Sequence, residues 1–348
     1  MIQKQPKIYF YIPRSDWPQV IPDRAEDLRP SDVLGSWILQ TYLRLQESGF
    51  SCQLIPEMPE EGIVVAYRYS LPYEAKPPAN LLWVCVKGDQ NPHPYAPIHI
   101  VQNACEVDSP SLQIQSIDED RYLLPSDRFY LPHWPQAGVI PRSPERGDRF
   151  ENVAYFGITY NLAPELSQPE WKEQLKQMGL NWRREKERDR WNNYSEVDAI
   201  LAVRSFNDST DYPWKPASKL FNAWNAGVPA ILGRESAFRG ERKSELDYIE
   251  VNSYEETVNA LKRLRDDTQF RQAMINNCKQ RAQEIAPENI TKRWKDFLLN
   301  TCVPAYEEWR SLSDWQRQKF FMGRYLALKW NSLQRRVLSL KRLKNHGL

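Results

Sequence analysis

The sequence lacks any long hydrophobic run, and this absence excludes a membrane-spanning helix. No stretch of about 18 apolar residues, the length that such a helix needs, is present, and the mean hydropathy is −0.68. The first apolar stretch, Lys7–Ile12, is too short for a secretory signal and is soon followed by Arg14 and Asp16. We therefore interpret it as a first strand and expect a cytoplasmic protein.

Cysteine is scarce, and its spacing gives no pattern. The five cysteines are an odd number without a C-x-x-C pair: Cys52, Cys85, Cys105, Cys278 and Cys302. Neither a disulfide framework nor a zinc site is indicated, so we expect reduced, mostly buried thiols. An Asp-x-Asp pattern next to a strand is also missing, since Asp118-Glu-Asp120 falls in an apparent loop. We predict no metal.

Acidic residues are missing from the last part of the sequence. From Trp315 to Leu348 there is no Asp or Glu, whereas the basic residues are Arg317, Lys319, Arg324, Lys329, Arg335, Arg336, Lys341, Arg342 and Lys344. Apolar residues recur at spacings of three and four, which predicts a long amphipathic helix: Met322, Leu326, Trp330, Leu333, Val337 and Leu340. Three hypotheses stay open for 317–348: packing on the N-terminal domain, an anionic membrane surface, and oligomerisation. The basic residues match no nucleic-acid recognition motif, so no nucleic-acid partner is expected.

The bulk composition is that of an ordinary globular protein. A chain of 348 residues exceeds the size at which single cores stop growing, which predicts two domains. Hydrophobic residues make up 41% and aromatics 12%, enough to fill two cores, and the net charge is only +2. There is no internal repeat.

The first half predicts a sheet with one clear helix. A helix is expected from a Ser31 cap to a Gly49 stop. Runs that are apolar on both faces suit parallel strands covered by helices, and they occur at Lys7–Ile12, Cys52–Ile55, Ile63–Ala66, Leu81–Val86 and Ile98–Val101. The strand–helix–strand order indicates a doubly wound α/β domain.

A second α/β unit is predicted after the proline-rich segment Leu131–Arg149, which we interpret as an interdomain linker. Ser253 and Glu256 form a capping box for one of its helices. The expected strands are Asn152–Gly157, Asp198–Val203, Val228–Leu232 and Leu246–Val251, and the expected helices are Pro169–Met178, Ala217–Ala226, one from Ser253 to about Leu264, and two more to about Asn300.

The segment Trp214–Gly233 is the most informative. Pro216 suits a first helical position, Gly227 ends the helix, and a strand follows. In an open α/β sheet such a helix begins at the crevice beyond the carboxyl ends of the strands, where ligands bind. Its free N–H groups and positive dipole end suit a diphosphate.

Polar residues of this helix extend the prediction. Ser218 offers a hydroxyl, Lys215 and Lys219 offer charge, and Asn222 lies one turn further on, where it would bond a ribose. The alternative is a helix whose lysines are merely solvated. Two lysines in a first turn are unfavourable for the helix dipole, by about 0.3–1 kcal/mol each, unless an anion sits there.

This segment resembles a known donor site. Lys219-Leu-Phe-Asn-Ala-Trp-Asn-Ala-Gly-Val-Pro-Ala-Ile is similar to the Pro-Ser-Lys-x-Phe-Glu-Tyr-x-x-x-Gly-x-Pro-Val-Ile stretch of bacterial GT-B glycosyltransferases, and also to fucosyltransferase-type enzymes. The likeness extends loosely from Asn152 to about Ala286. It implies the GT-B fold: two Rossmann-like domains facing a central cleft, with C-terminal helices that cross back. The expected parts are an acceptor-side domain at 1–145, a nucleotide-sugar domain at 150–302, and a C-terminal segment at 303–348.

The resemblance also implies roles for single residues. The lysine matched by Lys219 contacts the donor diphosphate, and the loop matched by Gly157 to Thr159 borders the phosphates. The residue matched by Asn222 binds the ribose, although the family has Glu there. The implied donor is a UDP- or GDP-sugar, and no cofactor or metal is expected.

Further site candidates come from their positions. Arg204 ends a strand and would stabilise the leaving diphosphate, or it is a surface arginine. An inverting transfer needs a base from the N-terminal domain, for which Asp16, Asp89 and His93 are candidates, whereas a retaining one needs none. Rings at proline-rich turns are acceptor candidates (Trp17, Trp134 and Trp214), while Trp224 is expected in the core.

The leading hypothesis is therefore a metal-independent glycosyltransferase that acts on a saccharide or lipid-linked acceptor, in the cytoplasm or peripherally at the inner face of the membrane. Two alternatives remain. One is a non-catalytic nucleotide- or glycan-binding subunit, which Asn222 in place of Glu supports. The other is a sugar-nucleotide epimerase of similar architecture.

Overall fold

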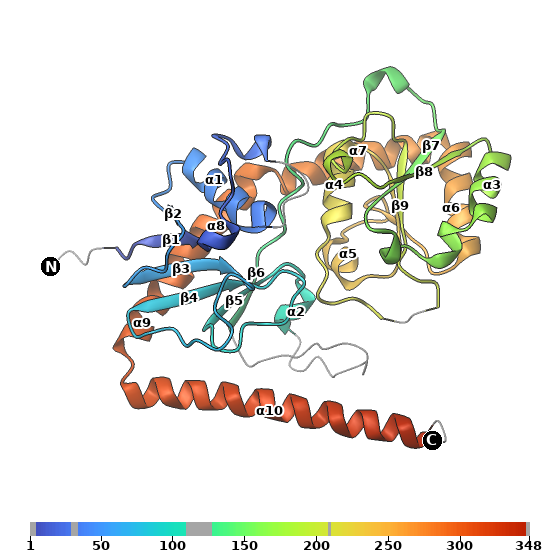
Figure 1. Ribbon diagram of the computed structural model, residues 1–348. Helices are drawn as coiled ribbons and strands as arrows, with labels where there is room; N and C mark the ends of the chain where they lie inside the picture. The colour runs from blue at the N-terminus through green and yellow to red at the C-terminus, as the bar shows by residue number, and fades with distance from the viewer. Residues whose placement is uncertain (1–4, 29–33, 109–126, 208–209, 346–348) are drawn as a thin grey trace. The chain divides into compact units, whose positions relative to one another are not determined.

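The computed structural model describes residues 5–28, 34–108, 127–207 and 210–345. Their contacts group into two compact units, coloured along the chain in Figure 1. The first unit contains Met1–Ile21, Trp37–Leu131 and Thr291–Leu348, and the second contains Pro22–Ser36 and Pro132–Ile290. The predicted domain limits 1–145, 150–302 and 303–348 stay a prediction. The predicted Asp118–Asp120 loop and the Ser31 cap lie outside the described residues.

The first unit is built on a six-stranded parallel sheet. Its strand order is β2-β1-β3-β4-β5-β6, and every neighbouring pair is parallel. The strands are β1 (Ile8–Tyr11), β2 (Gln53–Ile55), β3 (Gly62–Tyr67), β4 (Leu81–Val86), β5 (Ile98–Val101) and β6 (Asp127–Tyr130). β3, β4 and β5 are buried along their whole length, as the apolar runs predict.

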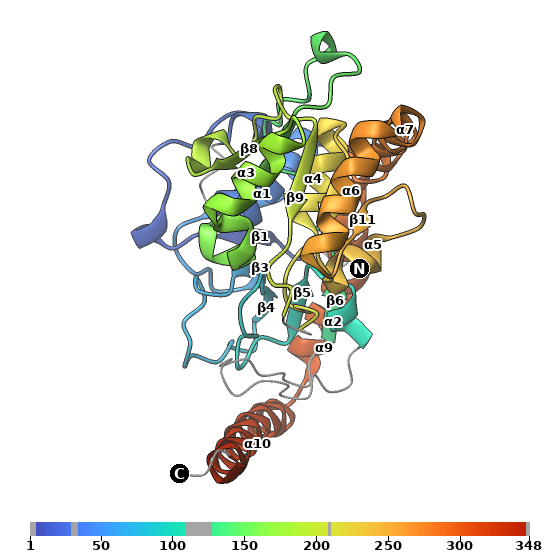
Figure 2. The ribbon, with the colours of Figure 1, turned by 90° about the vertical axis from the view of Figure 1, so that its right-hand side faces the viewer.

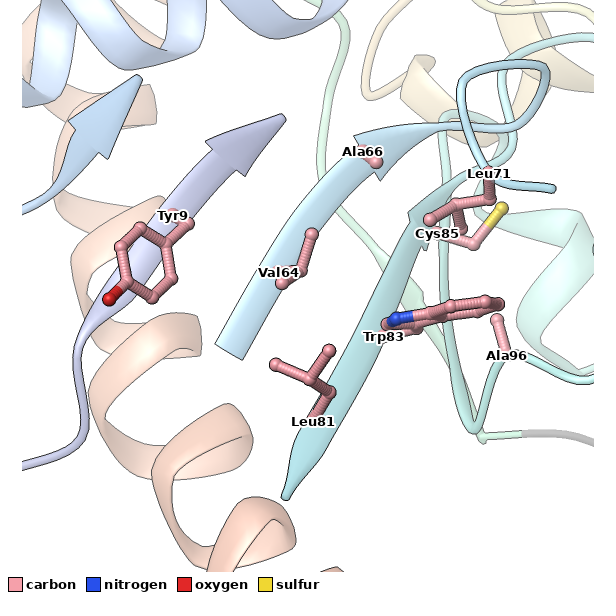
Figure 3. Close-up of a cluster of buried hydrophobic side chains, with 8 residues drawn as sticks. All are labelled: Tyr9, Val64, Ala66, Leu71, Leu81, Trp83, Cys85 and Ala96. Atoms are coloured by element: carbon pink, nitrogen blue, oxygen red, sulfur yellow. The ribbon is translucent and has the colours of Figure 1, made fainter. Parts of the chain in front are cut away.

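Alternate side chains of these strands form two cores. On one face a cluster of buried residues spreads over β1, β3 and β4, as Figure 3 shows: Tyr9, Val64, Ala66, Leu71, Leu81, Trp83, Cys85 and Ala96. On the other face, the Phe10 ring lies 6.2 Å from Tyr42 and 6.3 Å from Trp294. The helices that cover this second face are therefore α1 (Gln40–Glu47) and α8 (Pro287–Phe297).

The N-terminal helix differs from its predicted form. A π-helical segment, Gly35–Leu39, precedes α1. Gly49 has a φ of +72° and closes the helix end, as expected. Short helical segments complete the first half: η1 (Arg14–Asp16), η2 (Ala25–Asp27) and α2 (Cys105–Asp108).

The second unit holds a five-stranded parallel sheet in the order β11-β10-β9-β7-β8. Its strands are β7 (Asn152–Phe156), β8 (Asn181–Glu185), β9 (Ala199–Ala202), β10 (Ala230–Leu232) and β11 (Ile249–Glu250), and its helices are α3 (Pro169–Gln177), α4 (Ser218–Ala226), α5 (Ser236–Glu241), α6 (Tyr254–Asp266) and α7 (Thr268–Glu284). Figure 2 views this unit with α3 and α6 toward the reader. Two parallel sheets with helices confirm the predicted doubly wound α/β class.

The segment interpreted as a linker, 131–149, belongs to the second unit from Pro132 onward. Arg146 is 4% exposed and holds Asp198 with two hydrogen bonds, Nε to Oδ1 at 2.8 Å and Nη2 to Oδ2 at 2.7 Å. Arg142 Nε also donates to Asp198 Oδ1, at 2.9 Å. The two units divide between Leu131 and Pro132, at the start of this proline-rich segment, and the rest of the segment is packed along an irregular path.

After Ile290 the chain belongs to the first unit again. A π-helical segment (Leu298–Cys302), α9 (Val303–Ser311) and α10 (Asp314–Asn345) follow α8. Lys295 Nζ donates to Ser48 O at 3.0 Å, and Trp309 Nε1 donates to Pro78 O at 3.1 Å. In the described part of the chain, none of the helices is both long and apolar enough to cross a membrane.

Candidate functional site

The strand ends of the second unit bring an arginine and a carboxylate together. Arg204 follows β9 and Glu235 follows the neighbouring strand β10. Arg204 Nε donates to Glu235 Oε1 at 3.0 Å, and the two side chains are 13% and 4% exposed. Arg204 Nη1 donates to Asn161 Oδ1 at 2.6 Å, in the turn after β7. One guanidinium thus ties the loops after three parallel strands.

The N-terminus of α4 leaves backbone donors without helical partners. No side chain caps it, and its first turn has no acidic residue. The first helical hydrogen bond runs from Phe221 N to Ala217 O at 3.0 Å, so the N–H groups of 218–220 have no acceptor within the helix. Such a terminus attracts an anion. The observed helix matches the predicted one, and Gly227 ends it with a φ of +67°.

Lys219 adds positive charge in a partly buried position. Burial lowers the pKa of Lys219 to about 8; Arg204 and Lys215 lower it further, while Glu235 acts in the opposite direction. Its ammonium lies 5.7 Å from the centre of the Tyr155 ring. Lys219 therefore lies within electrostatic range of two other cations, Arg204 and Lys215, and of the carboxylate of Glu235. Negative charge bound beside Lys219 would favour its charged form.

A cavity of about 300 Å³ lies at the carboxyl ends of β9, β10 and β11. Arg204, Gly233 and Val251 line it where the strands end, and Glu235 lines it from the start of α5. Tyr212, also in its lining, has a φ of +47° and places its ring 5.3 Å from the Arg204 guanidinium. A non-glycine residue in this conformation is strained, which is common at ligand sites.

Gly157 allows a tight turn after β7. A Cβ at this position would lie 2.7 Å from the Tyr155 hydroxyl oxygen, so a side chain cannot fit without moving that ring. The Tyr155 hydroxyl donates to Ile158 O at 2.9 Å and fixes the turn. Thr159 follows in the same turn and is exposed. Gly157 therefore shapes the loop whose Tyr155 ring contacts Lys219.

Asn222 is engaged within the unit rather than open to a ligand. Its Oδ1 accepts from Gln136 N at 2.9 Å, and its Nδ2 donates to Gln136 Oε1 at 3.3 Å. The side chain also hydrogen-bonds the Tyr194 hydroxyl, and the residue is 9% exposed. Both ends of the amide are thus engaged, and the ribose contact of Asn222 stays a prediction.

His93, one of the three base candidates, is a structural residue of the first unit. It is fully buried, and its Nδ1 accepts from the backbone N–H groups of Tyr95 and Ala96, each at 3.1 Å. Its Nε2 donates to Pro72 O at 3.0 Å. Burial lowers the pKa of His93 to about 4. Both ring nitrogens are therefore engaged within the first unit, and a role of His93 as a base stays a prediction.

The two carboxylate candidates remain at strand ends of the same unit. Asp16 lies in the turn after β1 and is exposed. Asp89 follows β4, and its Oδ1 accepts from Gln90 Nε2 at 2.9 Å. Gln90 Oε1 in turn accepts from the Tyr69 hydroxyl at 2.8 Å. Both carboxylates lie at the carboxyl edge of the first sheet, and their role as a base stays a prediction.

The tryptophans divide into buried and partly exposed. Trp224 is in the core as predicted, 1% exposed, with its Nε1 donating to Asp247 O at 3.0 Å. Trp134 is 3% exposed, so its ring offers no face to a sugar. Trp17 and Trp214 are partly exposed, and the Trp214 ring packs edge-on against Tyr212 at 5.9 Å.

Sequence reasoning missed Glu235, Tyr155 and Asn161. Glu235 stands two residues after the predicted segment Trp214–Gly233, and the strand order that sets it beside Arg204 is visible only in three dimensions. An acidic residue directly after a buried strand was the available signal. Within the described residues, no group of three or more His, Cys, Asp or Glu side chains could hold a metal ion.

Comparisons with known proteins show similarity in fold. No family model matches the sequence, and no curated protein matches it either. Among solved structures, sucrose-phosphate synthase from Thermosynechococcus elongatus is similar with a TM-score of 0.54 at 9% identity, over 85% of this chain and 99% of that one. HepE from Anabaena, solved with UDP-glucose, gives a TM-score of 0.48 at 10% identity, over 85% of this chain and all of the other. With its two parallel α/β sheets and long C-terminal helices, the chain has the GT-B fold.

Proposed function

We propose that the protein is a glycosyltransferase that takes a sugar from a UDP- or GDP-sugar and transfers it to a hydroxyl group of a saccharide or lipid-linked acceptor. The observation that carries the proposal is the group of cations at the uncapped start of α4 in the second unit. Lys215 and Lys219 belong to this segment, and Arg204, which donates to Glu235, lies within electrostatic range of Lys219. Ser218 heads the helix and adds a hydroxyl.

The reaction needs this charge at one step. The bond between the sugar C1 and the diphosphate oxygen breaks, a bond from the acceptor oxygen to C1 forms, and the diphosphate leaves with both bonding electrons. Lys219, Arg204 and the α4 N–H groups stabilise the charge that grows on that leaving group. These groups replace a metal ion in the proposal. Gly157 and Thr159 shape the loop beside them.

The acceptor proton has two routes. In an inverting transfer it goes to a carboxylate of the first unit, for which Asp16 and Asp89 are the candidates. In a retaining transfer the leaving diphosphate accepts it, and no base is required. Trp17 and Trp214 are the remaining aromatic candidates for the acceptor site.

The proposed location is the cytoplasm, with a peripheral position at the inner face of the membrane when the acceptor is lipid-linked. The five free thiols support a reducing compartment. The basic residues of 317–348 support contact with an anionic surface.

A donor panel tests the proposal. UDP- and GDP-sugars are incubated with saccharide acceptors in EDTA, and release of the nucleoside diphosphate is followed for wild type, Lys219→Ala and the control Lys172→Ala, an exposed lysine on α3. We expect release by wild type and control, and a loss of roughly 100-fold or more in Lys219→Ala. Absence of turnover with every donor and acceptor would contradict it.

A second candidate is a nucleotide-binding subunit without activity. The resembling enzymes have Glu at the position of Asn222, and Asn222 is hydrogen-bonded to Gln136. Both observations favour this second candidate. Binding of nucleotides without turnover would select it. Formation of an epimeric donor in the absence of acceptor would select an epimerase.

A further inference from the structure

Helix α10 packs on the first unit with one face only. Arg324 is 2% exposed, and its Nη2 donates to Ala96 O at 3.0 Å. Phe321 is 5% exposed, and its ring lies 5.9 Å from Trp309 of α9. At about 100° of rotation per residue, Arg324 and Phe321 point to the same side of the helix. This side anchors the first half of α10.

The opposite side of α10 is a stripe of exposed apolar residues. They project within an arc of about 80° centred roughly opposite Arg324, and we call them the apolar stripe: Trp315 (71% exposed), Met322 (58%), Leu326 (58%), Trp330 (62%), Leu333 (52%) and Val337 (50%). Single exposed apolar residues are ordinary, whereas a row of six on one side of a helix marks a binding surface. Figure 1 shows the length of helix along which the stripe runs.

Basic and aromatic side chains accompany the stripe. Lys319 Nζ lies 5.5 Å from the centre of the Trp315 ring, and Lys329 Nζ lies 5.3 Å from that of Tyr325. Arg336, also exposed, continues the edge that Lys329 begins. Tryptophan and tyrosine rings beside long basic side chains suit the boundary between an apolar layer and charged headgroups.

We infer that the apolar stripe binds an anionic lipid surface, with α10 lying in the plane of the headgroups. Such a surface supplies both an apolar layer and negative charge. A second copy of the chain fits less well, because two helices that each lack any Asp or Glu after Asp314 would bring like charges together. The inference specifies the surface that would hold the protein at the peripheral location proposed above. It rests on the proposed function only for the idea that a lipid-linked acceptor lies in that membrane.

Vesicle flotation of the full chain tests the inference. The vesicles are phosphatidylcholine alone or phosphatidylcholine with phosphatidylserine. One variant, Leu326→Ser/Trp330→Ser/Leu333→Ser, removes the stripe, and another, Lys319→Gln/Lys329→Gln/Arg336→Gln, removes charge. All six positions are exposed, so folding is unaffected, as the melting temperature checks. Matched controls are Val20→Ser/Tyr160→Ser, at exposed apolar residues, and Lys172→Gln/Lys176→Gln, at exposed lysines.

We expect wild type and both controls to float with the anionic vesicles only. Each α10 variant should lose partitioning by roughly tenfold or more, while its thermal shift with nucleoside diphosphates stays that of wild type. Wild type that does not float, or α10 variants that float as well as the controls, would overturn the inference. A dimer in light scattering that the serine variant loses, without flotation of wild type, would assign the stripe to a second copy. Nucleotide binding is measured separately, by thermal shift. A failure to bind nucleotides would therefore contradict the proposed function but not the binding of α10 to lipid.

Discussion

Glu235 engages Arg204 with only one of its two carboxylate oxygens. Oε1 accepts from Arg204 Nε at 3.0 Å, whereas the buried Oε2 has no hydrogen-bond partner within the described residues. Removal of the cation that pairs with such a buried carboxylate strongly destabilises the fold. The pair therefore links the stability of the second unit to the charge of the candidate site.

Replacement of Arg204 tests this dependence. Arg204→Met should lower the free energy of unfolding by about 3–5 kcal/mol, because it leaves the buried carboxylate of Glu235 without its hydrogen-bonded cation. The double variant Arg204→Met/Glu235→Gln should recover much of that loss, since the buried side chain at position 235 is then neutral. Urea unfolding measures both. Costs that simply add in the double variant would show that the two side chains act independently.

Nucleotide binding should depend on pH through Lys219. Its pKa of about 8 lies below the ordinary lysine value, so the free protein loses this charge as pH rises through 8. A diphosphate favours the charged form, and binding at pH 9 should therefore take up a proton. We expect the affinity to fall by up to about tenfold per pH unit above 8, as measured by calorimetry in buffers of different ionisation enthalpy. The same pH dependence in Lys219→Met would assign it to another group.

Gly157→Ala should disturb both stability and the site. The added methyl group would lie 2.7 Å from the Tyr155 hydroxyl, so the ring beside Lys219 must move. A loss of about 1–3 kcal/mol in unfolding free energy is expected from overpacking, together with weaker nucleotide binding. Gly179→Ala is the control, because Gly179 shares a positive φ, +73°, but has open space around it. Equal effects of the two variants would mean that the contact with Tyr155 is unimportant.

The ion pair between Asp198 and Arg146 should contribute to the dependence of the unfolding free energy on pH in acid. Burial by itself would raise the pKa of Asp198, but hydrogen bonds from Arg146, from the N–H groups of Glu151 and Asn152, and from Arg142 outweigh it and lower this pKa. The stabilisation is therefore present above the ordinary carboxyl range and is lost as pH falls through the lowered pKa.

Substitution of Arg146 separates this pair from surface charges. Arg146→Gln should cost about 3–5 kcal/mol at neutral pH and much less in acid. The control Arg14→Gln removes an exposed pair with Glu57, 73% and 74% exposed, and should cost under about 1 kcal/mol. Urea unfolding across pH measures both, and a cost for Arg146→Gln that does not change with pH would contradict the assignment.

Local signals in the sequence predicted the elements that depend on them. The helix of the 214–233 segment, its Gly227 stop and the Ser253 cap on Glu256 N at 3.1 Å all follow from short-range chemistry. β8 was missed because it is an edge strand that carries Arg183, Arg184 and Glu185 rather than an apolar run.

Long-range bonds limited what could be predicted about the site. Asn222 was taken as a ligand contact, yet its partner Gln136 lies 86 positions away in the sequence. His93 likewise stands in a polar loop of the sequence but is buried, and Pro72, 21 positions before it, accepts from its ring. Pairings at such separations follow from the folded topology, so the residue types alone did not reveal them.

The binding of a nucleoside diphosphate at the start of α4 tests the central claim most directly. The measurement is the thermal shift of the full chain with UDP and with GDP in EDTA, for wild type, Lys219→Ala and Lys172→Ala. Wild type and Lys172→Ala should be stabilised by at least one of the two, by about 2.7 kcal/mol at a ligand concentration of 100 times Kd, and Lys219→Ala should lose most of this stabilisation. If neither nucleotide stabilises wild type, or if Lys219→Ala responds equally, the account of the site is contradicted.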